Sequence, residues 1–318
     1  MHKFAGLDGH TSSCTLGVMN PKGRHLSCQV IETNGEALGN AITSIPGKLH
    51  LCLEEGTQSS WLAEVLSPHV EELVVVGVGQ RRSRGPKSDK RDAFALANML
   101  RTNDLESVVY KQVGPYATLR QIVKVHAQVV QDVVRVKNRL RAIYRSRGVR
   151  ADKTIYHPNH RSSWLEQVPQ SSRAAAGLLY EQHDALLPVR AQAEKDLVKE
   201  AHCHAITKLL ETCPGFGPIR VAQVVATVVS PFRFRRRQQF WSYCGLGIVM
   251  RSSADWDQRP DGSWQRVTIN TTRGLNHNHN HMLKAAFKGA ATTVISLCPS
   301  DEPLRQSYLR QTAAGTKP

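Results

Sequence analysis

Alternating apolar and polar residues predict short strands near the start of the chain. Lys3 to Asp8 is a short apolar run, and Cys14 to Val18 and Leu26 to Val30 alternate with a period of two, as half-buried strands do. Asn20 to Gly23 has the composition of a tight turn between the second and third segments. We therefore expect three strands in an antiparallel meander.

The next segments alternate between helix and strand. The pattern predicts helices over 36–44 and 59–66, a strand over 49–54, and a very apolar strand over 73–78 that should lie at the centre of the sheet. The expected order is therefore βββαβαβα. This order matches the ribonuclease H-like fold, an α/β fold with a mixed sheet on which acidic residues gather at strand ends.

A long amphipathic helix follows Gly114. Apolar residues recur at steps of three and four from Leu119 to Ile143, and no Pro or Gly interrupts them before Gly148. The pattern predicts a coiled-coil arm or a long hairpin, in which a second helix over 171–210 returns antiparallel. The outward face is basic, and it either solvates the helix or contacts phosphates. Its cations are Arg120, Lys124, Arg135, Lys137, Arg139, Arg141, Arg145 and Arg147.

A Gly-rich turn opens the third region. Gly215 and Gly217 lie in a Pro-Gly-Phe-Gly-Pro turn that precedes an Ala- and Val-rich helix from Ile219. Such a turn can present backbone N–H groups to a phosphate oxygen, as in helix-hairpin-helix modules, and an ordinary Gly-rich helix entry has the same composition. A basic run lies close by and favours contact with the DNA backbone. Its candidate residues are Arg235, Arg236 and Arg237.

The charge balance indicates a polyanionic partner. The chain has 318 residues, with 42 Lys and Arg against 26 Asp and Glu, which gives a formal net charge of +16. Hydrophobic residues make up 41%, as in a folded globular protein, and no apolar run is long enough for a membrane span or a signal peptide. Seven cysteines without a C-x-x-C pair argue against a disulfide framework or a zinc ribbon. We expect a protein of the reducing cytoplasm, without a membrane partner.

Four acidic residues lie where the predicted sheet can gather them. Asp8 ends the first strand, Glu54 ends the fourth, and Asp89 and Asp92 are three residues apart on one face of a predicted helix. Clustered carboxylates repel one another unless cations neutralise them, and Mg²⁺ prefers carboxylate and phosphate oxygens. The four acids therefore predict a Mg²⁺-dependent phosphodiester site. Glu55 remains an alternative to Glu54.

A serine pair, a histidine-rich segment and the tryptophans are weaker signals. Ser252 and Ser253 follow the segment Tyr243 to Gly247, and a serine becomes a nucleophile only when it is oriented and deprotonated, so the pair alone indicates a turn. For the histidines from Asn276 to His281 we expect structural or DNA-contacting roles ahead of a zinc site. Single tryptophans without a stacking period are expected to be buried in the core or in an interface. They are Trp164, Trp241, Trp256 and Trp264.

Several motifs together resemble the transposases of the insertion-sequence one-ten family, in the family's order along almost the whole chain. The resemblance implies a RuvC-like domain with a DEDD metal site over 1–112 and a coiled-coil arm over 113–205. It also implies a mainly helical transposase domain with a nucleophilic serine over 206–299, followed by a polar and loose tail over 300–318. The motifs are the strand ending in Asp8, Leu53-Glu54-Glu55-Gly56-Thr57, Lys87-Ser88-Asp89-Lys90-Arg91-Asp92-Ala93, Lys137-Asn138-Arg139-Leu140, Pro214-Gly215-Phe216-Gly217-Pro218 and Tyr243-Cys244-Gly245-Leu246.

The same resemblance implies an RNA-guided DNA recombinase of a mobile insertion sequence. Members pair a structured non-coding bridge RNA with both target and donor DNA, and the implied assembly is a tetramer, built as a dimer of dimers with the coiled coil as a joint. The nucleophile falls on Ser253, with Ser252 as the alternative, and Ala254 occupies the place of the family's glycine. The DEDD set, which would bind Mg²⁺, falls on Asp8, Glu54, Asp89 and Asp92.

Two other functions remain open from the sequence. A Holliday-junction-type endonuclease would attack with metal-activated water, and its C-terminal domain would only bind DNA. A non-catalytic nucleic-acid-binding protein on a degenerate nuclease fold would need little beyond the positive charge. We favour the recombinase, acting at the nucleoid in a prokaryotic cytoplasm, because both chemistry-bearing segments occur together.

Overall fold

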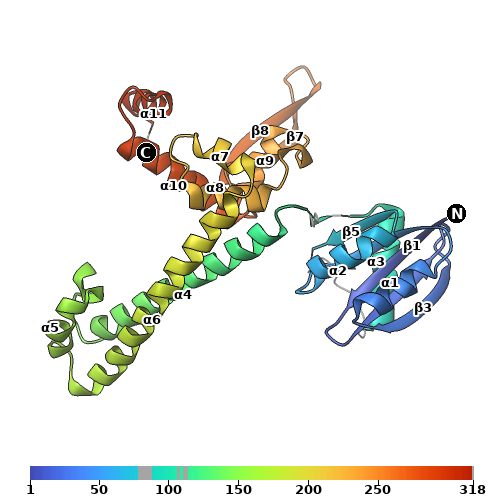
Figure 1. Ribbon diagram of the computed structural model, residues 1–318. Coiled ribbons are helices and arrows are strands. Elements are labelled where there is room, and N and C mark those ends of the chain that lie inside the picture. Colours follow the sequence, from blue (N-terminus) through green and yellow to red (C-terminus); the bar gives the residue numbers. More distant parts are fainter. Residues whose placement is uncertain (78–87, 106–107, 110–113, 317–318) are drawn as a thin grey trace. The chain divides into compact units, whose positions relative to one another are not determined.

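Figure 1 shows the computed structural model, in which residues 1–77, 88–105, 108–109 and 114–316 are described. The chain forms two compact units, Met1–Gly114 and Pro115–Pro318. The first unit is an α/β domain, whereas the second is mostly helical and contains one β-hairpin.

Six strands form one mixed sheet in the first unit: β1 (His2–Gly9), β2 (Ser13–Met19), β3 (His25–Glu32), β4 (Lys48–Glu54), β5 (Glu72–Val76) and β6 (Val108–Val109). Their order across the sheet is β3-β2-β1-β4-β5-β6. β2 pairs antiparallel with both β1 and β3, which confirms the predicted meander. β1, β4 and β5 run parallel, and β6 is antiparallel to β5.

Helices cover both faces of this sheet: α1 (Gly35–Thr43) and α2 (Ser59–Leu66) on one face, α3 (Asp89–Thr102) on the other, with a short 3-10 turn η1 (Ser67–His69) after α2. On the first face Leu38 and Leu62 pack with Leu51. On the second face Leu96 packs with Cys52. The observed order of these elements is the predicted one, with β6 added, and the mixed sheet fits the ribonuclease H-like expectation.

Local sequence explains the turns and helix starts of the first unit. The Asn20 side chain accepts a 2.9 Å hydrogen bond from the Arg24 amide, and Gly23 adopts φ 82°, a left-handed conformation that favours glycine. Asn34 caps α1, since its side-chain oxygen accepts the Glu36 amide at 2.9 Å. These contacts fix the ends of β2 and the start of α1.

Two long helices pack antiparallel in the second unit: α4 (Ala117–Arg145) and α6 (Gln170–Ala201), which are joined through η2 (Lys153–Tyr156), η3 (Pro158–His160) and α5 (Arg161–Glu166). Leu119 near the start of α4 packs with Leu197 near the end of α6. At the other end Tyr144 packs with Tyr180, and their hydroxyl oxygens are 3.1 Å apart. The predicted long hairpin is therefore present, and its treatment as a coiled coil stays a prediction.

The remaining elements of the second unit are α7 (Ala205–Glu211), α8 (Pro218–Val228), η4 (Pro231–Arg233), α9 (Arg237–Tyr243), the hairpin β7 (Ile248–Gln258) and β8 (Trp264–Leu275), α10 (His281–Leu297) and α11 (Pro303–Ala313). α8 packs against α4, α6, α7 and α10. In Figure 1 the β7–β8 hairpin extends from the part of this unit that contains α8 and α9.

Two expectations for the second unit were wrong. The helix expected over 171–210 ends at Ala201, because the buried Thr207 hydroxyl donates to the Ala201 carbonyl at 2.7 Å and the chain turns there before α7. The 300–318 tail contains α11, whose N-terminus is capped by the Glu302 side chain accepting from the Arg305 amide at 2.8 Å. The C-terminal domain, expected to be mainly helical, also holds the β7–β8 hairpin, which the sequence did not predict.

Candidate active site

Asp8 and Glu54 lie at the same edge of the sheet. β1 and β4 are parallel neighbours, and Leu7 pairs with Leu53, so each acid follows one member of that pair. Leu7 and Leu53 pack toward α1 and α2, and alternation along each strand therefore puts both acids on the opposite face, which α3 covers. Asp8 is buried and Glu54 is exposed.

Asp89 and Asp92 occupy the first turn of α3, close to the same sheet edge. α3 packs directly on β1 because Gly6 has no side chain. A Cβ there would clash with the Ala93 carbonyl oxygen and lie 2.6 Å from the Ala97 amide nitrogen. Acidic residues in the first turn also suit the positive end of the helix dipole.

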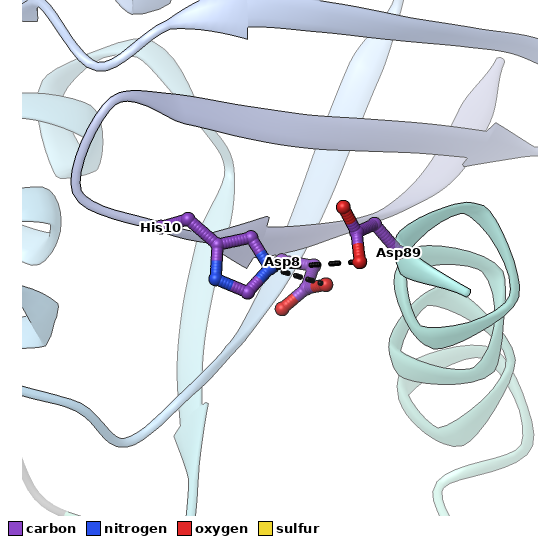
Figure 2. A group of neighbouring side chains, drawn as sticks. All are labelled: Asp8, His10 and Asp89. Carbon is purple, nitrogen blue, oxygen red and sulfur yellow. Dashed lines mark ion pairs between the residues drawn. The ribbon is translucent and has the colours of Figure 1, made fainter. Parts of the chain in front are cut away.

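His10 joins Asp8 and Asp89 in one group, as Figure 2 shows. Its Nε2 atom lies 3.4 Å from Oδ2 of Asp8 and 3.6 Å from Oδ1 of Asp89. Sequence patterns do not single out His10, because it lies in a short turn between β1 and β2 where no periodic pattern exists. The spacing Asp-x-His directly after a strand was the available signal.

The donor set of this group fits a divalent cation. One ligand atom from each of Asp8, His10 and Asp89 lies within 4.8 Å of the others, and the set combines two carboxylates with an imidazole. Among the described residues, this is the group of three His, Cys, Asp or Glu side chains whose ligand atoms all lie this close to one another. Glu54 and Asp92 lie outside it, although they share its sheet edge and helix turn.

Ser253 lies within a strand and not in the loop that the sequence indicated. It pairs with Ile269 across the β7–β8 hairpin, and Ser252 pairs with Asn270. The two serines are therefore consecutive positions of β7. The acidic insert beginning at Asp255 extends this hairpin toward its tip.

Two segments are hydrogen-bonded to each other at the base of this hairpin. They are Tyr243 to Gly247, before β7, and Asn276 to His281, after β8. The Asn276 amide donates to the Gly247 carbonyl at 3.1 Å, and the Asn280 amide donates to the Tyr243 carbonyl at 2.8 Å. A Cβ at Gly245, where φ is 70°, would lie 2.5 Å from the His279 ring. The histidine segment therefore has a structural role, and among the described residues it takes part in no group that could hold a metal ion.

Cys244 is part of the same base and is not a candidate nucleophile. Its thiol is fully buried, and burial raises its pKa to about 11, with Arg233 opposing the shift. A neutral thiol is a weak nucleophile. The residue packs as a small apolar side chain with Val228 and Leu283.

The candidate nucleic-acid contacts differ in their surroundings. Arg139 is exposed on α4, whereas Arg135 forms a 2.6 Å ion pair with Asp132 and the Arg141 guanidinium lies 5.4 Å from the centre of the Tyr156 ring. Gly215 is required by packing, because a Cβ there would clash with the carbonyl oxygen of Ala290 in α10.

Gly217 is exposed at the N-cap of α8, and a Cβ at this position would meet no atom within 4 Å. A phosphate can therefore approach its backbone. The basic run is exposed between η4 and α9 and comprises Arg235, Arg236 and Arg237.

The two tryptophans of the β7–β8 hairpin do not lie in the core. Trp256 and Trp264 lie near the hairpin tip and are 58% and 62% exposed. Trp241 on α9 is 45% exposed. Trp164 does pack beside Tyr144, with its ring nearly perpendicular to the tyrosine ring. For these three exposed rings, burial in an interface stays a prediction.

Comparison with protein families identifies the chain. Residues 5–146 match a family model for DEDD transposases of the IS110 type, described as transposase, and residues 207–267 match a model described as the transposase IS116/IS110/IS902 family. No curated protein matches the sequence. None of the described helices has the length and apolar composition that a membrane span requires. The two family matches cover the acidic edge of the sheet and the hairpin with its serines, and the chain is a DNA-binding transposase of the IS110 family.

Proposed function

We propose that this transposase exchanges DNA strands through a covalent serine–DNA intermediate, assisted by Mg²⁺ at the acidic sheet edge and guided by a structured bridge RNA. The observation that supports the proposal most is the meeting of Asp8, His10 and Asp89 at the end of β1. A buried carboxylate beside a second carboxylate is costly unless a cation compensates it. The IS110 family match supplies the DNA substrate.

The metal ligands in this proposal are Asp8, Glu54, Asp89 and Asp92, with His10 as an additional nitrogen donor. The carboxylates of Asp8 and Asp89 already lie near each other, and the strand and helix positions of Glu54 and Asp92 support their joining the group. Bound Mg²⁺ would stabilise the negative charge on a phosphodiester oxygen. The exposure of His10 and Asp89 leaves the group accessible to a DNA strand.

Ser253 is the proposed nucleophile, with Ser252 as the alternative. The serine Oγ would attack the phosphorus of a phosphodiester, so that an Oγ–P bond forms while one P–O bond to deoxyribose breaks. The serine loses its proton, and the departing sugar oxygen gains one to become a hydroxyl. Attack by the hydroxyl of the exchanged strand reverses the step and releases the serine. This route conserves the energy of the phosphodiester bond.

The guide RNA would bind the basic face of α4 as a backbone ligand. Arg139 is the strongest candidate there, because Arg135 and Arg141 also make contacts within the protein. Exchange between donor and target duplexes requires several active sites, and a dimer of dimers would provide them.

Reconstituted recombination tests this function. The purified full chain is mixed with RNA transcribed from the DNA that flanks its coding region and with the donor and target duplexes that this RNA specifies. We expect recombinant junctions that require RNA and Mg²⁺ and that disappear in Asp8→Asn, while this variant still binds the RNA. Recombination without RNA or in EDTA would contradict the proposal. Cleavage without strand joining and without a protein–DNA adduct would favour the endonuclease that uses metal-activated water.

A further inference from the structure

A basic surface surrounds the junction between η4 and α9. Between Glu211 and Asp255 the sequence contains no acidic residue. Six arginines occur in that interval, and four of them fall within the seven residues from Pro231 to Arg237. A cationic surface of this kind attracts the phosphates of a nucleic acid and repels a cationic protein surface. The six are Arg220, Arg233, Arg235, Arg236, Arg237 and Arg251. The exposed surface at this junction comprises Arg235, Arg236 and Arg237, whereas Arg220 donates to the Gly215 carbonyl and the Thr293 hydroxyl within the protein.

Phe232 and Phe234 in this run have opposite surroundings. The Phe234 ring packs with Phe240 and Tyr243 in a hydrophobic cluster, and the Arg233 guanidinium lies 4.6 Å from its centre. Phe232, two residues earlier, is 92% exposed, although it lies in an ordered 3-10 turn that begins at Pro231. The fold thus buries one phenylalanine and holds the other in solvent.

Cationic and aromatic side chains follow Phe232 along the chain. Arg235 and Arg236 line a surface depression of about 530 Å³ together with Gln238 and Gln239. On α9 the Arg237 guanidinium lies 5.4 Å from the centre of the Trp241 ring, which is itself partly exposed. The surface therefore combines phosphate-binding donors with an apolar tip. This combination is found in proteins that insert an apolar side chain between base pairs while cations hold the adjacent backbone.

We propose that Phe232 is a wedge that inserts into the base stack of duplex DNA, while Arg235 and Arg236 bind the phosphates beside it. The proposal rests on the function proposed above, in that DNA is the substrate. Strand exchange requires the duplex to be opened, and insertion of a ring lowers the cost of unpairing next to it. The DNA backbone supplies the negative charge that complements the arginines, and the base faces supply the apolar contact that complements the ring.

Binding of the full chain to two short labelled duplexes tests this inference. One duplex is fully paired, and the other carries a central mismatch where the bases are already partly unstacked. We expect wild-type protein to bind the mismatched duplex roughly 5- to 150-fold tighter, the range of one stacking contact. Phe232→Ala should reduce this ratio to about one and should leave the affinity for the paired duplex and the unfolding temperature unchanged.

Two further variants serve as controls. Arg235→Gln combined with Arg236→Gln should weaken binding to both duplexes equally and reduce the salt dependence, because phosphate contacts do not read base stacking. Phe234→Ala should lower the unfolding temperature, which separates loss of core packing from loss of the wedge.

Three results would overturn the wedge. In the first, Phe232→Ala still prefers the mismatched duplex. In the second, this variant changes the binding of an RNA hairpin and leaves DNA binding as it was. In the third, the variant changes the oligomeric state of the protein with DNA binding intact. Each would leave the proposed recombinase function in place. Wild-type protein that binds neither duplex would instead overturn both proposals.

Discussion

The Nε2 atom of His10 lies 3.4 Å from Oδ2 of Asp8 at the end of β1. An imidazole is a softer donor than a carboxylate, so its presence extends the range of metals toward Mn²⁺ and other transition metals. The group is therefore not a purely oxygen site of the kind that Mg²⁺ selects.

We expect His10 to coordinate Mn²⁺ directly through nitrogen. Electron spin-echo measurements on the Mn²⁺-loaded chain should show coupling to ¹⁴N, and His10→Ala should remove this coupling. The same variant should bind Mn²⁺ at least about tenfold more weakly, because even outer-shell partners of metal sites contribute that much. Asp8→Asn provides the matched control, since it should weaken Mn²⁺ binding more strongly. Bound Mn²⁺ without nitrogen coupling in the wild type would reduce His10 to an ion-pair partner of the two aspartates.

Glu54 and Glu55 can be separated by a matched pair of variants. Alternation along β4 puts Glu54 on the face that α3 covers, whereas Glu55 follows the last residue of the strand. Glu54→Gln should therefore abolish metal-dependent DNA cleavage, whereas Glu55→Gln should retain it. Cleavage assays across a Mg²⁺ titration check this. The reverse pattern would move the fourth ligand to Glu55.

Periodic patterns explain how much of the fold was predictable. The long helix around Val133 buries one face along its length, and its apolar residues therefore recur at steps of three and four. The strand around Leu51 is buried on both faces, and its residues are therefore almost continuously apolar. The order of elements up to α3 followed from these patterns.

The features that the sequence did not predict have no such periodic pattern. β7 and β8 form a two-stranded hairpin whose described tip residues are exposed on both faces, so apolar and polar residues do not alternate. His10 lies in a turn, and Phe232 is an apolar residue that the fold leaves uncovered. Sequence alone cannot distinguish Phe232 from Phe234, because their separation depends on which ring reaches the cluster around Tyr243. Sites built from turns and uncovered side chains therefore required the structure.

The buried tyrosine pair should couple α4 to α6 at the end of the hairpin that contains Tyr144. Tyr144 is fully buried and its hydroxyl lies 3.1 Å from that of Tyr180. Tyr180→Phe should cost about 1–3 kcal/mol, because it leaves the Tyr144 hydroxyl buried without this partner. The double variant with Tyr144→Phe should cost less than the sum of the single variants. Urea unfolding of all four proteins measures the coupling, and strictly additive costs would contradict it.

The stability of the α4–α6 hairpin should fall as the pH is lowered. Burial lowers the pKa of His126 below its ordinary value of 6.5, Glu194 opposes the shift and Arg190 adds to it. Neither ring nitrogen of His126 has a hydrogen-bond partner among the residues that the structure describes. The folded protein therefore holds the ring neutral, while the unfolded chain takes up a proton below about pH 6.5. The neutral His126 ring therefore leaves the free energy of unfolding at its full value above about pH 6.5, and this free energy falls as the pH is lowered further.

The loss should reach up to about 1.4 kcal/mol per pH unit for this group. Urea midpoints measured from neutral pH to about pH 5 check the slope, the lower limit lying well below the ordinary histidine pKa. His126→Leu should flatten it, and His183, whose pKa burial also lowers, should account for part of what remains. A slope unchanged in His126→Leu would show that other groups control the acid sensitivity.

The most direct test of the recombinase account is a search for protein covalently attached to DNA. The full chain is incubated with bridge RNA, Mg²⁺ and labelled donor DNA, and the mixture is run on a denaturing gel. Ser252 and Ser253 are consecutive residues of β7, and single variants separate their roles. We predict a denaturant-resistant band that Ser252→Ala retains and Ser253→Ala and Asp8→Asn abolish. A band lost only in Ser252→Ala would transfer the role to that residue. Cleaved DNA without any such band, in the wild type and in both serine variants, would contradict the covalent mechanism.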